Sequence, residues 1–191
     1  EKFAHTTYFF NCLHNEPYPG ESDILVESYK KHPEHPEMRS REVAEKLAEE
    51  LSKDSFDFGV INLSNADIIS HLGIMELAVR GAAAVDEALG LVRRAIAAKD
   101  GIMLITADHG NAESLVYRGT GEMETKHNLN PVPFFLAAKE YERPRTPEEL
   151  TFSFGDPQGL LSDIAPTILE LMQISAPPEM TGTSLLPLLI R

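Results

Sequence analysis

The sequence predicts an α/β fold, a three-layer α/β/α sandwich with a mostly parallel central sheet. Two patterns support this prediction. Short apolar runs alternate along the chain with longer segments in which apolar residues recur every three or four positions. The later runs are largely apolar throughout, which is typical of strands that are covered on both faces.

The amino-terminal part predicts one strand, one long loop and one helix. Residues 3–11 are β-branched and aromatic and end at a polar turn, so they predict a strand. Residues 14–39 are rich in Pro, Glu and His, which predicts a long loop around a short strand at 24–26. Ser40 is the expected N-cap of a helix that runs to about Ser52, because an apolar stripe follows it.

The rest of the chain alternates between strands and helices. Short apolar runs predict buried strands at 58–63, 102–106 and 132–137. Helical periodicity predicts helices at 74–99 and 162–172.

Length and composition limit the class of protein. The 191 residues are enough for a single domain spanning residues 1–191. No apolar run reaches about 18 residues, so no membrane span is expected. A formal net charge of −13 argues against binding to nucleic acid or to a membrane surface. The one cysteine, Cys12, cannot form an internal disulfide, which fits a cytoplasmic location. The chain begins at Glu1 within a predicted strand, so we expect a piece of a longer protein, incomplete at its amino-terminal side.

Three short segments concentrate side chains that can bind metal. Residues 65–71 follow the predicted strand at 58–63, and residues 106–111 follow the strand at 102–106. Residues 125–128 form the third segment and precede the last predicted strand. The carboxyl ends of strands form the ligand crevice of open α/β sheets, so the first two segments can converge there.

The spacing within these segments fits metal ligands. Asp67 and His71 lie one helical turn apart, which places a carboxylate and an imidazole on one face. Asp108 and His109 are adjacent, so both can serve one crevice only from a turn beyond the strand, where Gly110 permits a sharp backbone. Such ligands suit Mn²⁺, Zn²⁺ or Mg²⁺, and the lack of cysteine ligands argues against a structural zinc.

Each motif also has a purely structural interpretation. Asp67 could cap a helix, and His71 could be a surface histidine. Asp108 to Gly110 could form an ordinary turn, because Asp and Gly are common turn residues. His127 carries no signal when it is taken alone. Three imidazoles and two carboxylates near predicted strand ends are harder to explain together in this way.

These segments resemble those of cofactor-independent phosphoglycerate mutases, which are members of the alkaline phosphatase superfamily. The strongest match is the segment Ile105-Thr106-Ala107-Asp108-His109-Gly110-Asn111-Ala112-Glu113. Five further stretches agree with that family in order, namely Glu1-Lys2-Phe3-Ala4-His5, Pro36-Glu37-Met38, Asn130-Pro131-Val132-Pro133-Phe134, Asp163-Ile164-Ala165-Pro166-Thr167 and Met180-Thr181-Gly182-Thr183-Ser184-Leu185-Leu186. The Asp-His-Gly motif alone would indicate only the superfamily. The opening Glu-Lys-Phe-Ala-His narrows the resemblance to the mutases.

The resemblance implies an alkaline-phosphatase-like fold and two divalent metal ions. Manganese is expected, with Zn²⁺, Co²⁺ or Mg²⁺ as alternatives. Asp67, His71 and His127 would hold one ion, and Asp108 and His109 would hold the other. No 2,3-bisphosphoglycerate is required in that family.

The resemblance also implies a glycolytic isomerase that interconverts 3- and 2-phosphoglycerate through a phosphoserine. Lys2 would contact the transferred phosphoryl group as a point cation. The metals would lower the pKa of the serine and stabilise charge on the attacking and leaving oxygens. Phosphoglycerate is therefore the expected partner, with no nucleic acid and no membrane.

The chain departs from the family pattern in what it lacks. The family's Asn-Ser motif, the nearby aspartate ligand and the inserted substrate-binding domain are absent, so we expect the isolated chain to be inactive. The full-length enzyme is expected to be monomeric, whereas the isolated chain would self-associate through an exposed sheet edge. Two alternatives remain: another phosphomutase or phosphodiesterase of the superfamily, and a metal-binding domain that has lost its catalytic role.

Overall fold

The computed structural model describes residues 1–117 and 119–190. The chain forms two compact units. The first unit contains residues 1–101 and 110–129, and the second contains residues 102–109 and 130–191. The expectation of one domain over 1–191 stays a prediction.

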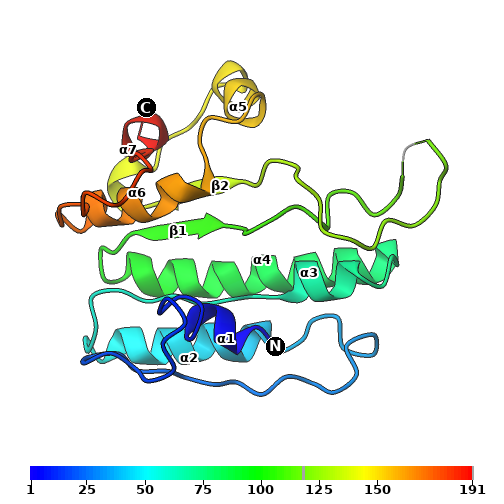
Figure 1. The fold of residues 1–191 in the computed structure, drawn as a ribbon, viewed down its shortest axis with the longest axis horizontal. Helices are drawn as coiled ribbons and strands as arrows, with labels where there is room; N and C mark the ends of the chain where they lie inside the picture. Colours follow the sequence, from blue (N-terminus) through cyan, green and yellow to red (C-terminus); the bar gives the residue numbers. More distant parts are fainter. Residues whose placement is uncertain (118, 191) are drawn as a thin grey trace. The chain divides into compact units, whose positions relative to one another are not determined.

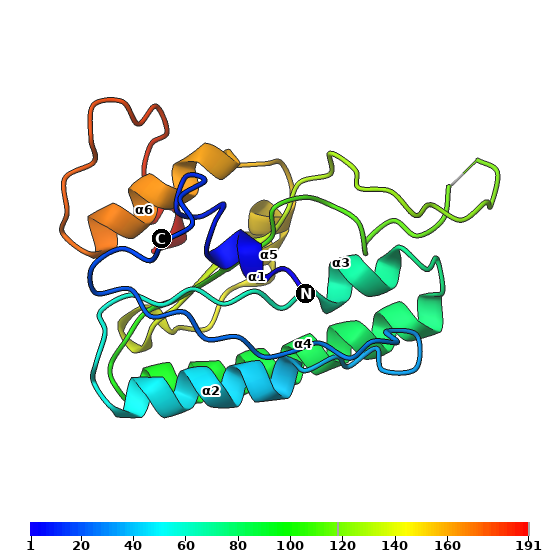
Figure 2. The ribbon, with the colours of Figure 1, turned by 60° about the horizontal axis from the view of Figure 1, so that its bottom comes forward.

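The first unit is built on helix α4 (Met75–Ala97), which packs against α2 (Ser40–Ser52) and α3 (Asn65–Ser70). Figures 1 and 2 both show α2 alongside α4. Ala44 of α2 and Ala88 of α4 are buried, with 0% and 1% of their surface exposed. Small side chains at such positions let helices approach closely, because little side-chain volume separates the backbones.

The helices of this unit lie close to their predicted positions. The helix predicted from the Ser40 cap to about Ser52 corresponds to α2, and the helix predicted over 74–99 corresponds to α4. The predicted cap is wrong, because Ser40 is the first residue of α2 and Arg39 precedes it as the cap. The buried hydroxyl of Ser40 instead donates to the side-chain oxygen of Asn65, which ties α2 to α3.

The strand predicted over residues 3–11 is wrong. Helix α1 (Phe3–Thr6) begins there, and turns continue to Leu13. The hydroxyls of Thr6 and Thr7 donate to the carbonyl of Phe3 at 3.1 and 3.0 Å. Such local bonds offer the backbone an alternative to a sheet ladder, and here they outweigh the strand propensity of the aromatic and β-branched residues.

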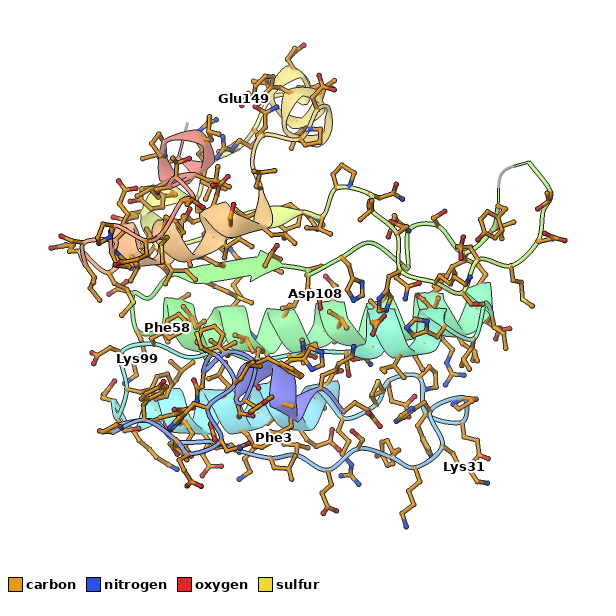
Figure 3. All side chains as sticks on the ribbon, viewed as in Figure 1. Phe3, Lys31, Phe58, Lys99, Asp108 and Glu149 are labelled. Atoms are coloured by element: carbon orange, nitrogen blue, oxygen red, sulfur yellow. The ribbon has the colours of Figure 1, made fainter. Side chains whose placement is uncertain are left out.

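Two other segments predicted as strands form no ladder within the described residues. Residues 24–26 are irregular, and residues 58–63 have no assigned secondary structure. Phe58 and Val60 remain 42% and 40% exposed, and Figure 3 labels the first of them. A strand forms only beside a neighbour that satisfies its backbone groups, and no such neighbour is described for these segments.

The long loop predicted over residues 14–39 is present and reaches α4 (Figure 2). A Cβ atom at Gly81 would lie 3.3 Å from the carbonyl oxygen of Pro36. The glycine therefore allows the loop to approach the helix closely.

The second unit contains the only ladder between named strands in the described part of the chain. Strand β1 (Met103–Thr106) pairs with β2 (Phe134–Ala137), with Met103 opposite Ala137 and Thr106 opposite Phe134. Both strands fall where they were predicted. Their pairing is antiparallel, however, so the mostly parallel sheet is not found among the described residues. Parallel neighbours need a crossover connection, and the described residues between β1 and β2 contain no helix to provide one.

The remaining elements of the second unit follow β2. They are η1 (Lys139–Tyr141), α5 (Pro147–Phe154), η2 (Leu161–Asp163), α6 (Ile164–Leu171) and α7 (Leu186–Leu189). The helix predicted over 162–172 corresponds to η2 and α6 together. The hydroxyl of Thr167 donates to the carbonyl of Asp163 at 2.7 Å and accepts the N–H of Leu185 at 2.8 Å, so it ties the closing segment to α6. No described helix is long and apolar enough to cross a membrane.

Candidate metal centre

Helix α3 carries two of the predicted ligands and is anchored by a buried asparagine. Asn65 is 1% exposed; its oxygen accepts from Ser40, and its side-chain nitrogen donates to the carbonyl of Pro36 at 2.9 Å. Both hydrogen-bonding ends of this buried amide are therefore satisfied. This anchoring fixes the start of the helix, two residues before Asp67.

The first unit brings Asp67, His71 and His127 together. His71 Nε2 lies 3.0 Å and His127 Nε2 lies 2.9 Å from Oδ1 of Asp67. The two Nε2 atoms are 3.1 Å apart. All three candidate ligand atoms lie within 4.8 Å of one another, although His127 is 60 residues from Asp67 in sequence.

A backbone carbonyl sets the orientation of His71. Its Nδ1 lies 2.6 Å from the carbonyl oxygen of Thr125. A carbonyl can only accept, so Nδ1 is the donor, and in the neutral ring Nε2 keeps its lone pair. Metal-binding histidines are commonly oriented in this way by a hydrogen bond to the other ring nitrogen.

The trio of Asp67, His71 and His127 fits a divalent cation. Asp67 Oδ1 and His71 Nε2 are both acceptors, so their approach to 3.0 Å is unfavourable unless a positive charge lies between them or on the ring. Ligand atoms that each lie about 2.1 Å from one ion are about 3 Å apart when their bonds meet at right angles. The observed separations match this value. One carboxylate oxygen and two imidazole nitrogens suit a first-row divalent metal.

The carboxylate of Asp67 is held in its charged form. Lys2 Nζ lies 2.8 Å from Oδ2, and the side-chain nitrogen of Asn111 donates to Oδ1 at 2.9 Å. Burial raises the pKa of the Asp67 carboxyl, but the hydrogen bonds from Lys2 and Asn111 and the charge of Lys2 outweigh burial, so the pKa falls well below its ordinary value. The oxygen is therefore ready to bind a metal at neutral pH.

A short backbone ladder places the segment of His127 beside the segment of Asn111. Gly110 N–H donates to the carbonyl of Asn128 at 3.3 Å, and Asn128 N–H donates to the carbonyl of Gly110 at 2.9 Å. A Cβ atom at Gly110 would collide with the side chains of Asn128 and Glu113. Position 110 therefore needs a glycine because other side chains already fill the space beside its backbone.

The other predicted site residues have different settings. Lys2 was expected to contact a phosphoryl group, and in this structure its ammonium contacts Asp67, so its catalytic role stays a prediction. Strand β1 ends at Thr106, which puts Asp108 and His109 beyond the strand as a shared crevice requires. Asp108, labelled in Figure 3, is exposed, and its Oδ1 lies 3.5 Å from His109 Nε2. These two residues belong to the second unit, and their participation in a metal centre stays a prediction.

Sequence reasoning missed two contributors to the trio. Asn111 belongs to the Asp-His-Gly-Asn motif, and its position there is the sequence signal for its contact with Asp67. Thr125 contributes through its backbone carbonyl, which every residue type has, so the sequence gives no signal for this contact.

Comparison with known proteins identifies the chain's relatives. A family model described as the Metalloenzyme superfamily matches residues 1–176. The 2,3-bisphosphoglycerate-independent phosphoglycerate mutase of Clostridium botulinum is 40% identical over 188 residues, which cover 97% of this chain and 35% of that protein. The enzymes of the same name from Clostridioides difficile and Thermomicrobium roseum are 41% and 40% identical, with the same coverage. The chain thus spans about a third of the length of these curated relatives.

A solved structure agrees with these relatives. It is described as Leishmania mexicana phosphoglycerate mutase at low cobalt concentration. The match has a TM-score of 0.78 and 26% identity, and it covers 95% of this chain and 35% of that one.

Proposed function

Because this chain belongs to the Metalloenzyme superfamily, we propose that it is the carboxy-terminal, metal-binding part of a phosphoglycerate mutase. The longer protein would interconvert 3- and 2-phosphoglycerate, and would therefore be an isomerase of glycolysis. A serine outside this chain would carry the phosphoryl group between the two hydroxyls. The isolated chain would bind metal without turning over substrate.

The observation that carries the proposal is the convergence of Asp67, His71 and His127 in a chain that matches the mutases along 97% of its length. An i, i+4 Asp and His pair is common by chance. Chance does not readily bring in a third ligand from 60 residues away while a carbonyl also orients one of the rings.

The chain's own residues would have separate tasks. Asp67, His71 and His127 would hold one divalent ion, and Asp108 and His109 would contribute to a second. A bound ion of this kind lowers the pKa of a nearby hydroxyl and offsets negative charge on phosphoryl oxygens. Lys2 would offer its ammonium to the phosphoryl group, and it would keep Asp67 ionised through their ion pair.

We propose manganese as the native metal, with cobalt, zinc and magnesium as alternatives. A set of two imidazoles and one carboxylate is compatible with manganese, cobalt and zinc, whereas magnesium prefers oxygen ligands. Cobalt is named in the description of the solved relative, which supports its use as a probe.

The fold of the longer protein would be a three-layer α/β/α sandwich with a mostly parallel sheet. Residues 58–63 support this, because they carry a largely apolar sequence without forming a ladder. Strands from the rest of the protein would pair with them. Phosphoglycerate would be the substrate, the location would be cytoplasmic, and both compact units would belong to one domain.

The test is an activity assay of the protein extended to the length of its relatives. Conversion of 3- to 2-phosphoglycerate, followed by phosphorus NMR without added 2,3-bisphosphoglycerate, is expected with a divalent metal such as Mn²⁺ or Co²⁺ and is expected to stop when a chelator removes the metal. His127→Ala should reduce turnover by more than the roughly 10- to 100-fold that loss of a residue supporting a metal ligand costs, because it removes a ligand itself. His14→Ala is the matched control, since His14 contacts the carbonyl of Glu16 and not the trio.

Two outcomes would favour the alternatives. Preferred hydrolysis of a phosphodiester would indicate a different member of the superfamily. Tight metal binding with no turnover of any phosphate ester would indicate a domain that has lost its catalytic role.

A further inference from the structure

Glu113 bridges the two segments on which the trio depends. Its Oε2 accepts the backbone N–H of Asn111 at 2.8 Å, and its Oε1 accepts from the side-chain nitrogen of Asn128 at 2.7 Å. Asn111 is the residue that donates to Asp67 Oδ1, and Asn128 directly follows His127. One carboxylate therefore joins the support of Asp67 to the segment that carries His127.

The bridge reaches the trio through short connections. From Glu113, the path to Asp67 runs through Asn111, which is 4% exposed and donates to Asp67 Oδ1. The path to His127 runs through the neighbouring Asn128, whose backbone is paired with Gly110. The carboxylate and the Asn128 side chain fill the space beside Gly110, where no Cβ atom fits.

A carboxylate matches both of these donors as they are oriented in this structure. Glu113 accepts from two donors at once, one backbone N–H and one amide NH₂. A glutamine at this position could accept one bond, but its own NH₂ would then face the NH₂ of Asn128 in the orientation that Asn128 has here. An aspartate would be one methylene shorter and would reach one donor at most.

We propose that Glu113 is a positioning residue of the metal centre. It sets the separation between Asp67 Oδ1 and His127 Nε2, which is 2.9 Å in this structure. Loss of the bridge lets the His127 segment shift relative to α3, and the metal then binds more weakly and in a different geometry. This inference rests on the metal site of the proposed function.

The test is a Co²⁺ titration followed by the visible absorption of the bound ion, which reports both affinity and ligand geometry. For Glu113→Gln, we expect the Kd to rise by roughly 10- to 100-fold and the absorption bands to shift. The double variant Glu113→Gln with Asn128→Asp should recover the wild-type Kd to within about threefold. In that variant, the amide NH₂ at position 113 can donate to the carboxylate at 128, while its oxygen accepts from Asn111.

Two further variants complete the design. Glu122→Gln is the matched control, because Glu122 lies in the same loop and contacts Thr120 rather than the trio. Its Kd and spectrum should equal those of the wild type. Glu113→Asp keeps the charge, and it tests the proposal if Glu113→Gln does not fold, as judged by circular dichroism. A weaker Kd is expected for it as well.

The outcomes separate this inference from the metal site itself. Wild-type affinity and spectrum in the folded Glu113 variants would overturn the positioning role and leave the metal site standing, even if the melting temperature fell. Failure of the double variant to recover affinity would also overturn it. A wild-type chain that is folded yet binds no Co²⁺ would overturn both proposals.

Discussion

Lys2 holds its ammonium nitrogen 2.8 Å from Oδ2 of Asp67, the carboxylate oxygen that does not face His71 and His127. The side chains of Lys2 and Asp67 are only 19% and 15% exposed, so solvent screens the pair incompletely. The ion pair therefore has two effects. It keeps Asp67 ionised, and it places a positive charge close to the position of a bound cation.

The first prediction follows from the second effect. Lys2→Met should tighten Mn²⁺ binding at pH 7 by about tenfold, because it removes a charge that repels the metal. Calorimetric titration at low salt measures the change. Lys31→Met is the control, since Lys31 pairs with Glu34 in the long loop (Figure 3) and should leave the Kd unchanged. Weaker binding in Lys2→Met would show instead that the ion pair mainly orients Asp67.

The second prediction concerns the packing of α2 on α4. Ala44 has no exposed surface, so Ala44→Leu forces extra volume into the helix interface. We expect the free energy of unfolding to fall by ~1–3 kcal/mol. Urea denaturation measures this loss. Ala83→Leu on the exposed face of α4 is the control, and an equal loss in both variants would contradict the packing account.

The third prediction concerns the extended segment at 58–63. This segment pairs with no strand among the described residues, and with its exposed Phe58 and Val60 it forms an edge that a second copy can extend. Val60→Lys should shift the isolated chain toward the monomer in sedimentation experiments, because an edge lysine blocks such pairing. Val79→Lys is the control: it replaces an exposed valine of α4 and should not change the monomer fraction. An isolated chain that is monomeric without substitution would rule out this edge as an interface.

How far the sequence predicts the structure depends on whether the signal is local. Helix α2 is predicted to within one residue, because its apolar stripe and its packing face are the same residues. The strand expected at 3–11 fails because the threonine hydroxyls bond the backbone locally. Residues 58–63 keep a strand-like sequence without a ladder, since a strand also depends on a partner that its own residues do not encode.

The site shows the same division. Asp67 and His71 are predictable from their i, i+4 spacing, because one helical turn sets their separation. No spacing rule predicts that His127 joins them, since a non-local fold brings it there. The carbonyl of Thr125 and the bridge through Glu113 are visible only in three dimensions.

The fourth prediction concerns the start of α5 and its dependence on pH. Hydrogen bonds from Arg143 and from the backbone N–H of Thr146 lower the pKa of Glu149 to about 2. A lowered pKa in the folded state means that ionised Glu149 stabilises the fold above its ordinary pKa of 4.5, and that this contribution is lost as the pH falls toward 2. Glu149→Gln should therefore lower the melting temperature at pH 6 and have a smaller effect at pH 3.

Thermal unfolding at a series of pH values tests this fourth prediction. Glu148→Gln is the control, because it removes a charge from the same helical turn without touching the capping box of Thr146 and Glu149. A difference between wild type and Glu149→Gln that stays constant from pH 6 to pH 3 would show that charge at Glu149 does not stabilise α5.

The fifth prediction is the central one: Asp67, His71 and His127 form a preassembled site for one divalent ion. The most direct test is a calorimetric Mn²⁺ titration of this chain beside its His127→Ala and His14→Ala variants. We predict a saturable site that is retained in His14→Ala and lost in His127→Ala. A folded chain that shows no saturable binding, or a site that survives His127→Ala unchanged, would contradict the assignment of these three ligands.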